Sequence, residues 1–115
     1  MLLAVKPNAV VHAAAQPLQH ELVAADQSIS GDPRTGVVEL GRFAGLDVGI
    51  WEMTPGVMRD VEAEEVFVVL SGAATVEFAD GSAPLALGPG DVVRLTAGTE
   101  TVWTVTETLR KVYLT

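Results

Sequence analysis

Short apolar stretches separated by glycine and other turn residues recur from residue 37 to the C-terminus. We predict strands over 37–43, 47–53, 65–70, 73–78, 84–87, 91–95, 100–106 and 109–114. Strands this short and this regularly spaced are typical of an all-β sandwich or barrel. The segments LSGA at 70–73 and ADGS at 79–82 favour turns between successive strands, so antiparallel neighbours are expected.

Residues 1–36 differ from the rest, because alanine, glutamine, histidine and proline are mixed there without a sustained period. The turn-rich stretch SGDPRTG at 30–36 ends this region. We therefore predict an irregular N-terminal arm over 1–36, followed by a single barrel domain over 37–115. A short helix over 17–25 is compatible with the arm, since Pro17 would stand in its first turn.

The predicted strand 65–70 is apolar on both faces. Side chains alternate along a strand, so one face holds Glu65, Phe67 and Val69 and the other holds Val66, Val68 and Leu70. One face suits a barrel interior, whereas the other needs cover from a second sheet, the arm or another subunit. A symmetric homodimer would supply that cover.

Composition and charge narrow the classes of partner. The chain has 115 residues, which suits one domain, and 49% of them are hydrophobic, which suits a folded chain. The 15 acidic and 7 basic residues give a net charge of −8, which disfavours nucleic acids and membrane surfaces as partners. No cysteine is present, which excludes disulfides, thiolate metal sites and cysteine nucleophiles.

Two features bear on location. The opening apolar run MLLAV meets Lys6 and Pro7, so it is shorter than the roughly 7–15 apolar residues of a signal peptide. No later apolar run approaches the roughly 18 residues that a membrane-spanning helix needs. We therefore expect a cytoplasmic protein.

Two separated segments carry a family resemblance. EVFVVLSG at 65–72 and GDVVRLTAG at 90–98 resemble the two motifs of the cupin superfamily, which implies a double-stranded β-helix, or jelly-roll barrel. GIWEMTPG at 49–56 and WTVTETLRKVY at 103–113 resemble the small single-domain cupins of the ethanolamine-utilisation Q-type and ureidoglycine-aminohydrolase-like group. One architecture of this kind hosts many unrelated chemistries, so the resemblance informs the fold more than the function.

The same resemblance raises the question of a metal, because cupins commonly hold one with three histidines and a glutamate. Glu65 stands at the glutamate position, whereas the histidine positions hold Met58, Asp60 and Thr101. The two histidines of the chain, His12 and His20, lie outside these positions and would reach the barrel only if the arm folded into its mouth. We therefore expect no tightly bound metal and no other cofactor. The alternative is a weak site for a hard cation, which would rest on Glu65 and Asp60 alone.

Glu65 is the candidate for acid–base chemistry. It shares the inward face of its strand with Phe67, and a carboxylate in apolar surroundings suits a general acid or base. The alternative is a structural pair with a basic residue, for which we name Arg59, Arg94 and Arg110. Two adjacent bases, Arg110 and Lys111, lie on opposite faces of one strand, so one is expected to pair inward while the other meets solvent.

Aromatic residues and further carboxylates make a small polar or cationic molecule the favoured ligand. Only one of Trp51 and Glu52 can point inward, because they are neighbours on one strand. Trp103 shares a face with Thr101 and either lines a pocket or simply fills the core. The acidic run at 60–65 either forms a solvated rim or attracts cations. The candidate ligand-binding residues are Trp51, Glu52, Met58, Asp60, Phe67, Thr101, Trp103 and Tyr113.

Three functions are compatible with these residues. The first is binding of a small polar or cationic metabolite in the barrel. The second is a metal-independent hydrolase, isomerase or lyase in which Glu65 transfers a proton, assisted by a second carboxylate or Tyr113. The third is an accessory or structural dimeric subunit whose barrel is merely packed.

Overall fold

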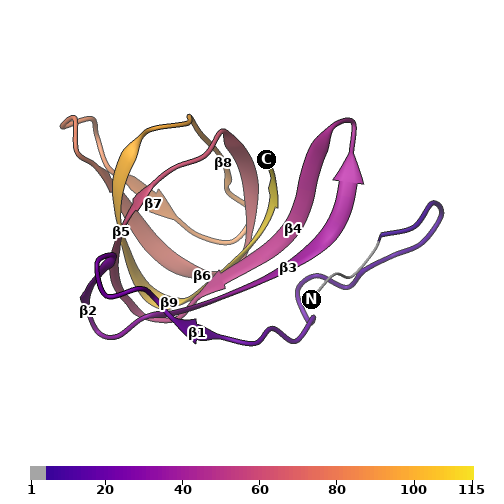
Figure 1. Ribbon diagram of the computed structural model, residues 1–115, viewed down its shortest axis with the longest axis horizontal. Coiled ribbons are helices and arrows are strands. Elements are labelled where there is room, and N and C mark those ends of the chain that lie inside the picture. The colour runs from indigo at the N-terminus through magenta and orange to yellow at the C-terminus, as the bar shows by residue number, and fades with distance from the viewer. Residues whose placement is uncertain (1–4) are drawn as a thin grey trace.

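The computed structural model describes residues 5–115 and contains nine strands and no helix in that range. The arm contributes two short strands and the rest belong to the barrel (Figure 1). The strands are β1 (Glu21–Leu22), β2 (Ser28–Ser30), β3 (Arg34–Phe43), β4 (Leu46–Met53), β5 (Gly56–Val61), β6 (Glu65–Phe78), β7 (Leu85–Leu87), β8 (Val92–Leu95) and β9 (Glu100–Leu114). The predicted all-β jelly-roll fold is confirmed.

The strands form one curled antiparallel sheet. Its main path runs β1-β3-β4-β9-β5-β2, and β6 joins it by pairing with β7, β8 and β9. Strand β9 pairs with β5 along its first half and with β4 along its second half, while β6 runs along its other edge. Figure 1 shows the sheet curling around an interior, with the β3–β4 hairpin extending from one side. Residues from both halves of β9 therefore reach the same interior.

The turn predicted at 70–73 is wrong, because β6 continues through it. Gly72 has a φ of +94°, and a Cβ there would overlap the carbonyl oxygen of Thr108 on β9. The glycine therefore marks an irregularity where two long strands approach closely, and not a reversal of the chain. Strands predicted separately at 100–106 and 109–114 are likewise one strand, β9. The predicted turn at 79–82 is confirmed, since β6 and β7 pair across it.

The sequence pattern missed β5, whose inward positions include the polar residue Asp60. The helix considered over 17–25 is wrong, because that segment is extended and holds β1. Strands β1 and β2 pair with β3 and β5, so they add short edges to the sheet. The boundary between arm and barrel at residue 36 stays a prediction.

Two apolar clusters lie on opposite faces of the sheet. The larger fills the barrel and includes Phe67, Trp103 and Leu109. The smaller lies outside it, where Val11, Ala13 and Leu18 of the arm pack on a buried group that consists of Val38, Leu40 and Ile50. The arm thus covers the outer face of β3 and β4, and cover for the outer face of residues 65–70, like the homodimer, stays a prediction. Residues 5–115 contain no helix long and apolar enough to cross a bilayer.

Candidate functional site

A cavity of about 290 Å³ opens inside the barrel. Acidic, aromatic and apolar side chains line it, and Lys111 is the single basic residue among the described residues that do so. The lining consists of Val37, Trp51, Asp60, Val61, Glu62, Ala63, Glu65, Trp103, Lys111 and Tyr113. A cavity of this size suits a small metabolite.

A larger chamber of about 750 Å³ adjoins this cavity between the arm and the barrel. Arm residues between 16 and 27 form one wall, and parts of β3, β4 and β5 form the other. Val37, Trp51 and Asp60 line both spaces, so the chamber and the inner cavity are neighbours.

Lys111 projects from β9 into the barrel, where it has two kinds of partner. Its Nζ lies 3.0 Å from Oε2 of Glu65, and both side chains are largely buried, at 6% and 13% exposure. The same Nζ lies 4.7, 4.2 and 5.1 Å from the ring centres of Trp51, Phe67 and Trp103. Three rings within about 6 Å stabilise an ammonium group through their negative faces. Lys111 therefore occupies an aromatic cage and neutralises a carboxylate at once.

Glu62 is buried and accepts two hydrogen bonds on one oxygen. Thr101 Oγ1 lies 2.5 Å from Glu62 Oε2, and the indole Nε1 of Trp103 donates to the same atom at 2.9 Å. These donors stabilise a carboxylate that burial alone would disfavour. They also fix the Trp103 ring, which lies 5.6 Å from the ring of Trp51 between ring centres.

Asp60 projects from β5 and is the least stabilised of the three carboxylates that line the cavity, those of Asp60, Glu62 and Glu65. Its Oδ1 accepts the backbone N–H of Val61 at 2.8 Å, the one hydrogen bond that its carboxylate makes with residues 5–115. Burial, followed by the negative charge of Glu62, raises the pKa of Asp60 above its ordinary value of 3.8. Among residues 5–115, Asp60 therefore has no cationic partner within hydrogen-bonding distance, and a cation brought to the cavity would favour its ionised form.

The carboxylates of the lining do not use all of their oxygens in hydrogen bonds. Every fully buried side-chain nitrogen or oxygen among residues 5–115 has a hydrogen-bond partner. One oxygen each of Asp60, Glu62 and Glu65 has none, so those oxygens are reachable by solvent. Each of the three lining carboxylates thus has one oxygen available for a further hydrogen bond.

Tyr113 lies at the β4 side of the cavity. Its ring packs against Gly49, where a Cβ would overlap the phenol oxygen. Burial is the largest cause that raises the pKa of Tyr113, and the charges of Glu39, Glu65 and Asp47 add to it. Tyr113 therefore stays a neutral phenol at physiological pH.

Trp51 and Glu52 point to opposite faces, as the alternation predicted. Trp51 lines the cavity, whereas Glu52 lies outside the barrel beneath the arm. Glu52 Oε1 accepts from Arg110 Nε at 3.0 Å, and Oε2 lies 2.6 Å from Nε2 of His20. Burial would raise the pKa of Glu52, but hydrogen bonds from Arg110 and His20 outweigh it and lower that pKa below 4.5. The inclusion of Glu52 among the cavity residues is therefore wrong.

Two expectations about the basic residues are also corrected. Glu65 pairs with Lys111 and not with an arginine, since Arg94 pairs with Glu64 on the surface and Arg110 lies on the outer face. Arg110 is buried and does not meet solvent, because its guanidinium also donates to backbone carbonyls of the arm.

The structure brings together most of the predicted site residues. Asp60, Glu65, Trp51, Trp103 and Tyr113 line the inner cavity. Met58 lines the outer chamber, Phe67 contacts the Lys111 ammonium, and Thr101 lies behind Glu62. Their part in binding stays a prediction.

Sequence reasoning missed Glu62 and Lys111 as site residues. Glu62 continues the inward alternation of Met58 and Asp60, a signal that was lost because β5 was not expected. Lys111 alternates with Leu109 and Tyr113, both buried, so its parity indicated an inward position.

Three of the four residues at the metal positions of the cupin pattern do not suit a metal ion. Met58 offers a thioether, Thr101 is hydrogen-bonded to Glu62, and Glu65 contacts an ammonium that would repel a metal cation. Within residues 5–115, no three histidine, aspartate or glutamate side chains gather as a metal-binding group.

Comparison with known proteins agrees with this architecture. Residues 40–113 match the family described as the EutQ-like cupin domain. Comparison with curated proteins finds no match.

Solved structures of several kinds share the fold. The EutQ protein of Clostridium difficile is 15% identical with a TM-score of 0.62, covering 82% of this chain and 78% of that one. A DUF861 family protein of Thermotoga maritima is 29% identical with a TM-score of 0.53, covering 56% and 73%. A structure of DMSP lyases is 22% identical with a TM-score of 0.65, covering 84% and 54%. The family match spans more than half of this chain, and the chain therefore belongs to the EutQ-like cupins.

Proposed function

We propose that this cupin binds a small organic cation in its inner cavity, and that it does so without a tightly bound metal. The observation that carries the proposal is the charge of the lining. Three carboxylates, those of Asp60, Glu62 and Glu65, face the cavity together with a single ammonium, that of Lys111. The excess of negative charge favours a positively charged guest.

Asp60 is the residue best suited to receive the cation. Glu65 already has the Lys111 ammonium at 3.0 Å, and one oxygen of Glu62 already accepts from two donors. Within the described part of the chain, Asp60 has only a backbone N–H as partner, and it lines both the inner cavity and the outer chamber. Trp51 also lines both spaces, and its ring offers a second attractive group for an ammonium.

The size of the cavity limits the guest. A space of about 290 Å³ accommodates a compact amine, amidine or similar group, and any extension of the molecule would lie in the outer chamber. Glutamine side chains of the arm line that chamber and offer hydrogen bonds to a polar extension.

Isothermal titration calorimetry tests the proposal with three small three-carbon molecules that differ in charge: propylammonium, 1-propanol and propionate. We expect the parent protein to bind propylammonium and neither of the others. Asp60→Asn should weaken that binding about tenfold or more, because a tenfold loss corresponds to about 1.4 kcal/mol, a modest fraction of a partly buried charge interaction.

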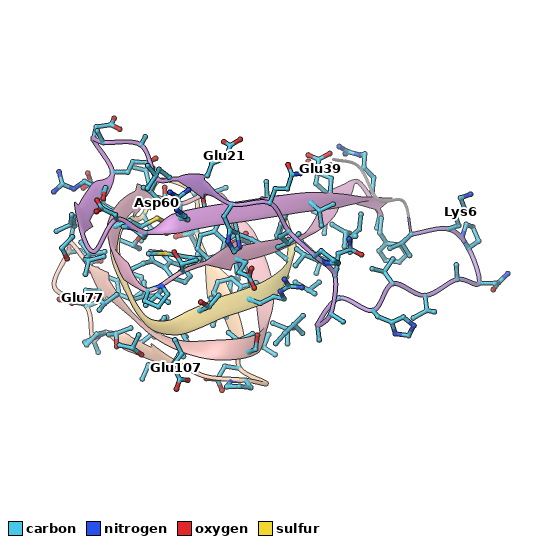
Figure 2. All side chains as sticks on the ribbon, turned by 90° about the horizontal axis from the view of Figure 1, so that it is seen from below. Lys6, Glu21, Glu39, Asp60, Glu77 and Glu107 are labelled. Atoms are coloured by element: carbon cyan, nitrogen blue, oxygen red, sulfur yellow. The ribbon has the colours of Figure 1, made fainter. Side chains whose placement is uncertain are left out.

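Glu77→Gln is the matched control. Glu77 is exposed and lies at the outside of the barrel (Figure 2), so its substitution removes the same charge from the molecule without touching the cavity. We expect Glu77→Gln to bind propylammonium as the parent does. Equal affinities for the parent and Asp60→Asn would contradict the proposal.

A further inference from the structure

We propose that Lys111 is a built-in cation of the barrel, which takes over at Glu65 the role that a metal ion has in the cupin pattern. Glu65 is the one residue of the metal-binding pattern that this chain retains. Its Oε2 lies 3.0 Å from the Lys111 Nζ, so the retained carboxylate meets an ammonium held by the chain itself.

The surroundings of Lys111 are those of a cation site. Trp51, Phe67 and Trp103 present their rings to the Nζ at 4.7, 4.2 and 5.1 Å between Nζ and ring centre. An aromatic cage of this kind is how proteins recognise ammonium ligands. Here the occupant is a side chain of β9, and the carboxylate of Glu65 completes the site.

Register explains how the chain places the ammonium there. Lys111 is opposite Trp51 on β4 and opposite Val69 on β6, two residues beyond Phe67. Its side chain thus starts at the centre of the inner face. The adjacent Arg110 points the other way and pairs with Glu52, so the two bases of this dipeptide neutralise one carboxylate inside the barrel and one outside.

The consequence concerns the position of Glu65. Held through Oε2, it keeps its other oxygen free of hydrogen bonds within residues 5–115 and open to the cavity. Lys111 is in these terms a positioning residue for Glu65. This inference does not depend on any ligand, and therefore stands or falls separately from binding at Asp60.

Chemical rescue tests the inference. Lys111→Ala removes the ammonium and leaves space for methylammonium between Glu65 and the three rings. We expect a lowered melting temperature that methylammonium chloride raises in a concentration-dependent way, as a ligand of the folded state does. Sodium chloride and tetramethylammonium chloride at equal concentration should not raise it, because neither donates an N–H to Glu65.

A surface variant, Arg94→Ala, and a double variant, Lys111→Ala with Asp60→Asn, serve as controls. Arg94→Ala breaks the exposed pair between Arg94 and Glu64, so we expect no specific rescue by methylammonium. In Lys111→Ala combined with Asp60→Asn, rescue should persist, which separates this site from the one proposed at Asp60. Folded Lys111→Ala that shows no selective response to methylammonium would overturn the inference.

A double-mutant cycle decides the matter if Lys111→Ala does not fold. Lys111→Met leaves Glu65 buried without its partner, and we expect its melting temperature to fall by roughly 10 °C or more. Adding Glu65→Gln should restore part of that loss, because the carboxylate is then gone as well. Additive losses in the cycle would overturn the role of Lys111 as the cation of Glu65.

Discussion

Asp60, Glu62 and Glu65 share one cavity, yet each carboxylate meets a different counterpart. In residues 5–115, Glu65 meets an ammonium, Glu62 meets two neutral donors, and Asp60 meets only the backbone N–H of Val61. The first two are stabilised by the protein itself. The third retains an unfavourable charge, as functional residues often do.

Asp60→Asn should therefore stabilise the unliganded protein near neutral pH. The pKa of Asp60 is raised in the folded state, so its ionised form lowers stability as pH rises above 3.8 and through the raised pKa. Asparagine removes this penalty while its side-chain oxygen still accepts from Val61. We expect a melting temperature higher by roughly a few degrees at pH 7, with the gain shrinking as pH falls toward 3.8.

Thermal unfolding of the parent and Asp60→Asn across this pH range measures the effect. Glu77→Gln, which lowers the net negative charge equally, is the control. A parent protein more stable than Asp60→Asn at pH 7 would contradict the claim that the ionised Asp60 side chain destabilises the fold.

Among the elements, β9 and the arm determine where the charged groups lie. Strand β9 carries Trp103 and Lys111 into one cavity because it is long and pairs with both β5 and β4. The arm is held on the outer face through Arg110, whose guanidinium donates to Glu52 and to the carbonyl oxygens of Ala13 and Gln16. That attachment also positions the arm wall of the outer chamber.

Glu52→Ala should release the arm. The substitution leaves Arg110 buried without its carboxylate, a loss of about 3 kcal/mol for pairs of this kind. We expect faster amide hydrogen exchange over residues 11–20 and faster proteolysis of the arm, with slower exchange retained in β6. Unchanged exchange in the arm would show that its apolar contacts alone hold it in place.

Lowering the pH should also loosen the arm of the parent protein. The pKa of Glu52 is lowered in the folded state. The Glu52 carboxylate therefore stabilises the fold above pH 4.5, and this contribution is lost as the pH falls through the lowered pKa. Asp47→Asn, which breaks an exposed pair with Arg42, is a control that should leave the arm unaffected.

The fold was predictable from the alternation of apolar residues and from two motif segments, whereas parts of the site were not. Strand β5 was missed because its inward positions include a carboxylate, which breaks the apolar pattern. Gly72 was assigned to a turn, since sequence alone does not show that another strand approaches it. The partner of Glu65 was likewise beyond reach, because the pairing of β6 with β9 brings together residues far apart in the chain.

At the scale of the whole molecule, the net charge of −8 acts in the same direction as the cavity. A negative molecule attracts cations over a distance of about a Debye length, roughly 10 Å at 0.1 M salt. Binding of an organic cation should therefore weaken as salt is added. The chain also has only two tryptophans, Trp51 and Trp103, and both line the cavity.

Tryptophan fluorescence thus reports on the cavity alone, and its titration with propylammonium tests most directly whether the barrel takes up small cations. We predict a saturable change with propylammonium that weakens with added sodium chloride, and no saturable change with 1-propanol or propionate. An unchanged spectrum with propylammonium, or the same response to all three molecules, would contradict a cation-binding cavity.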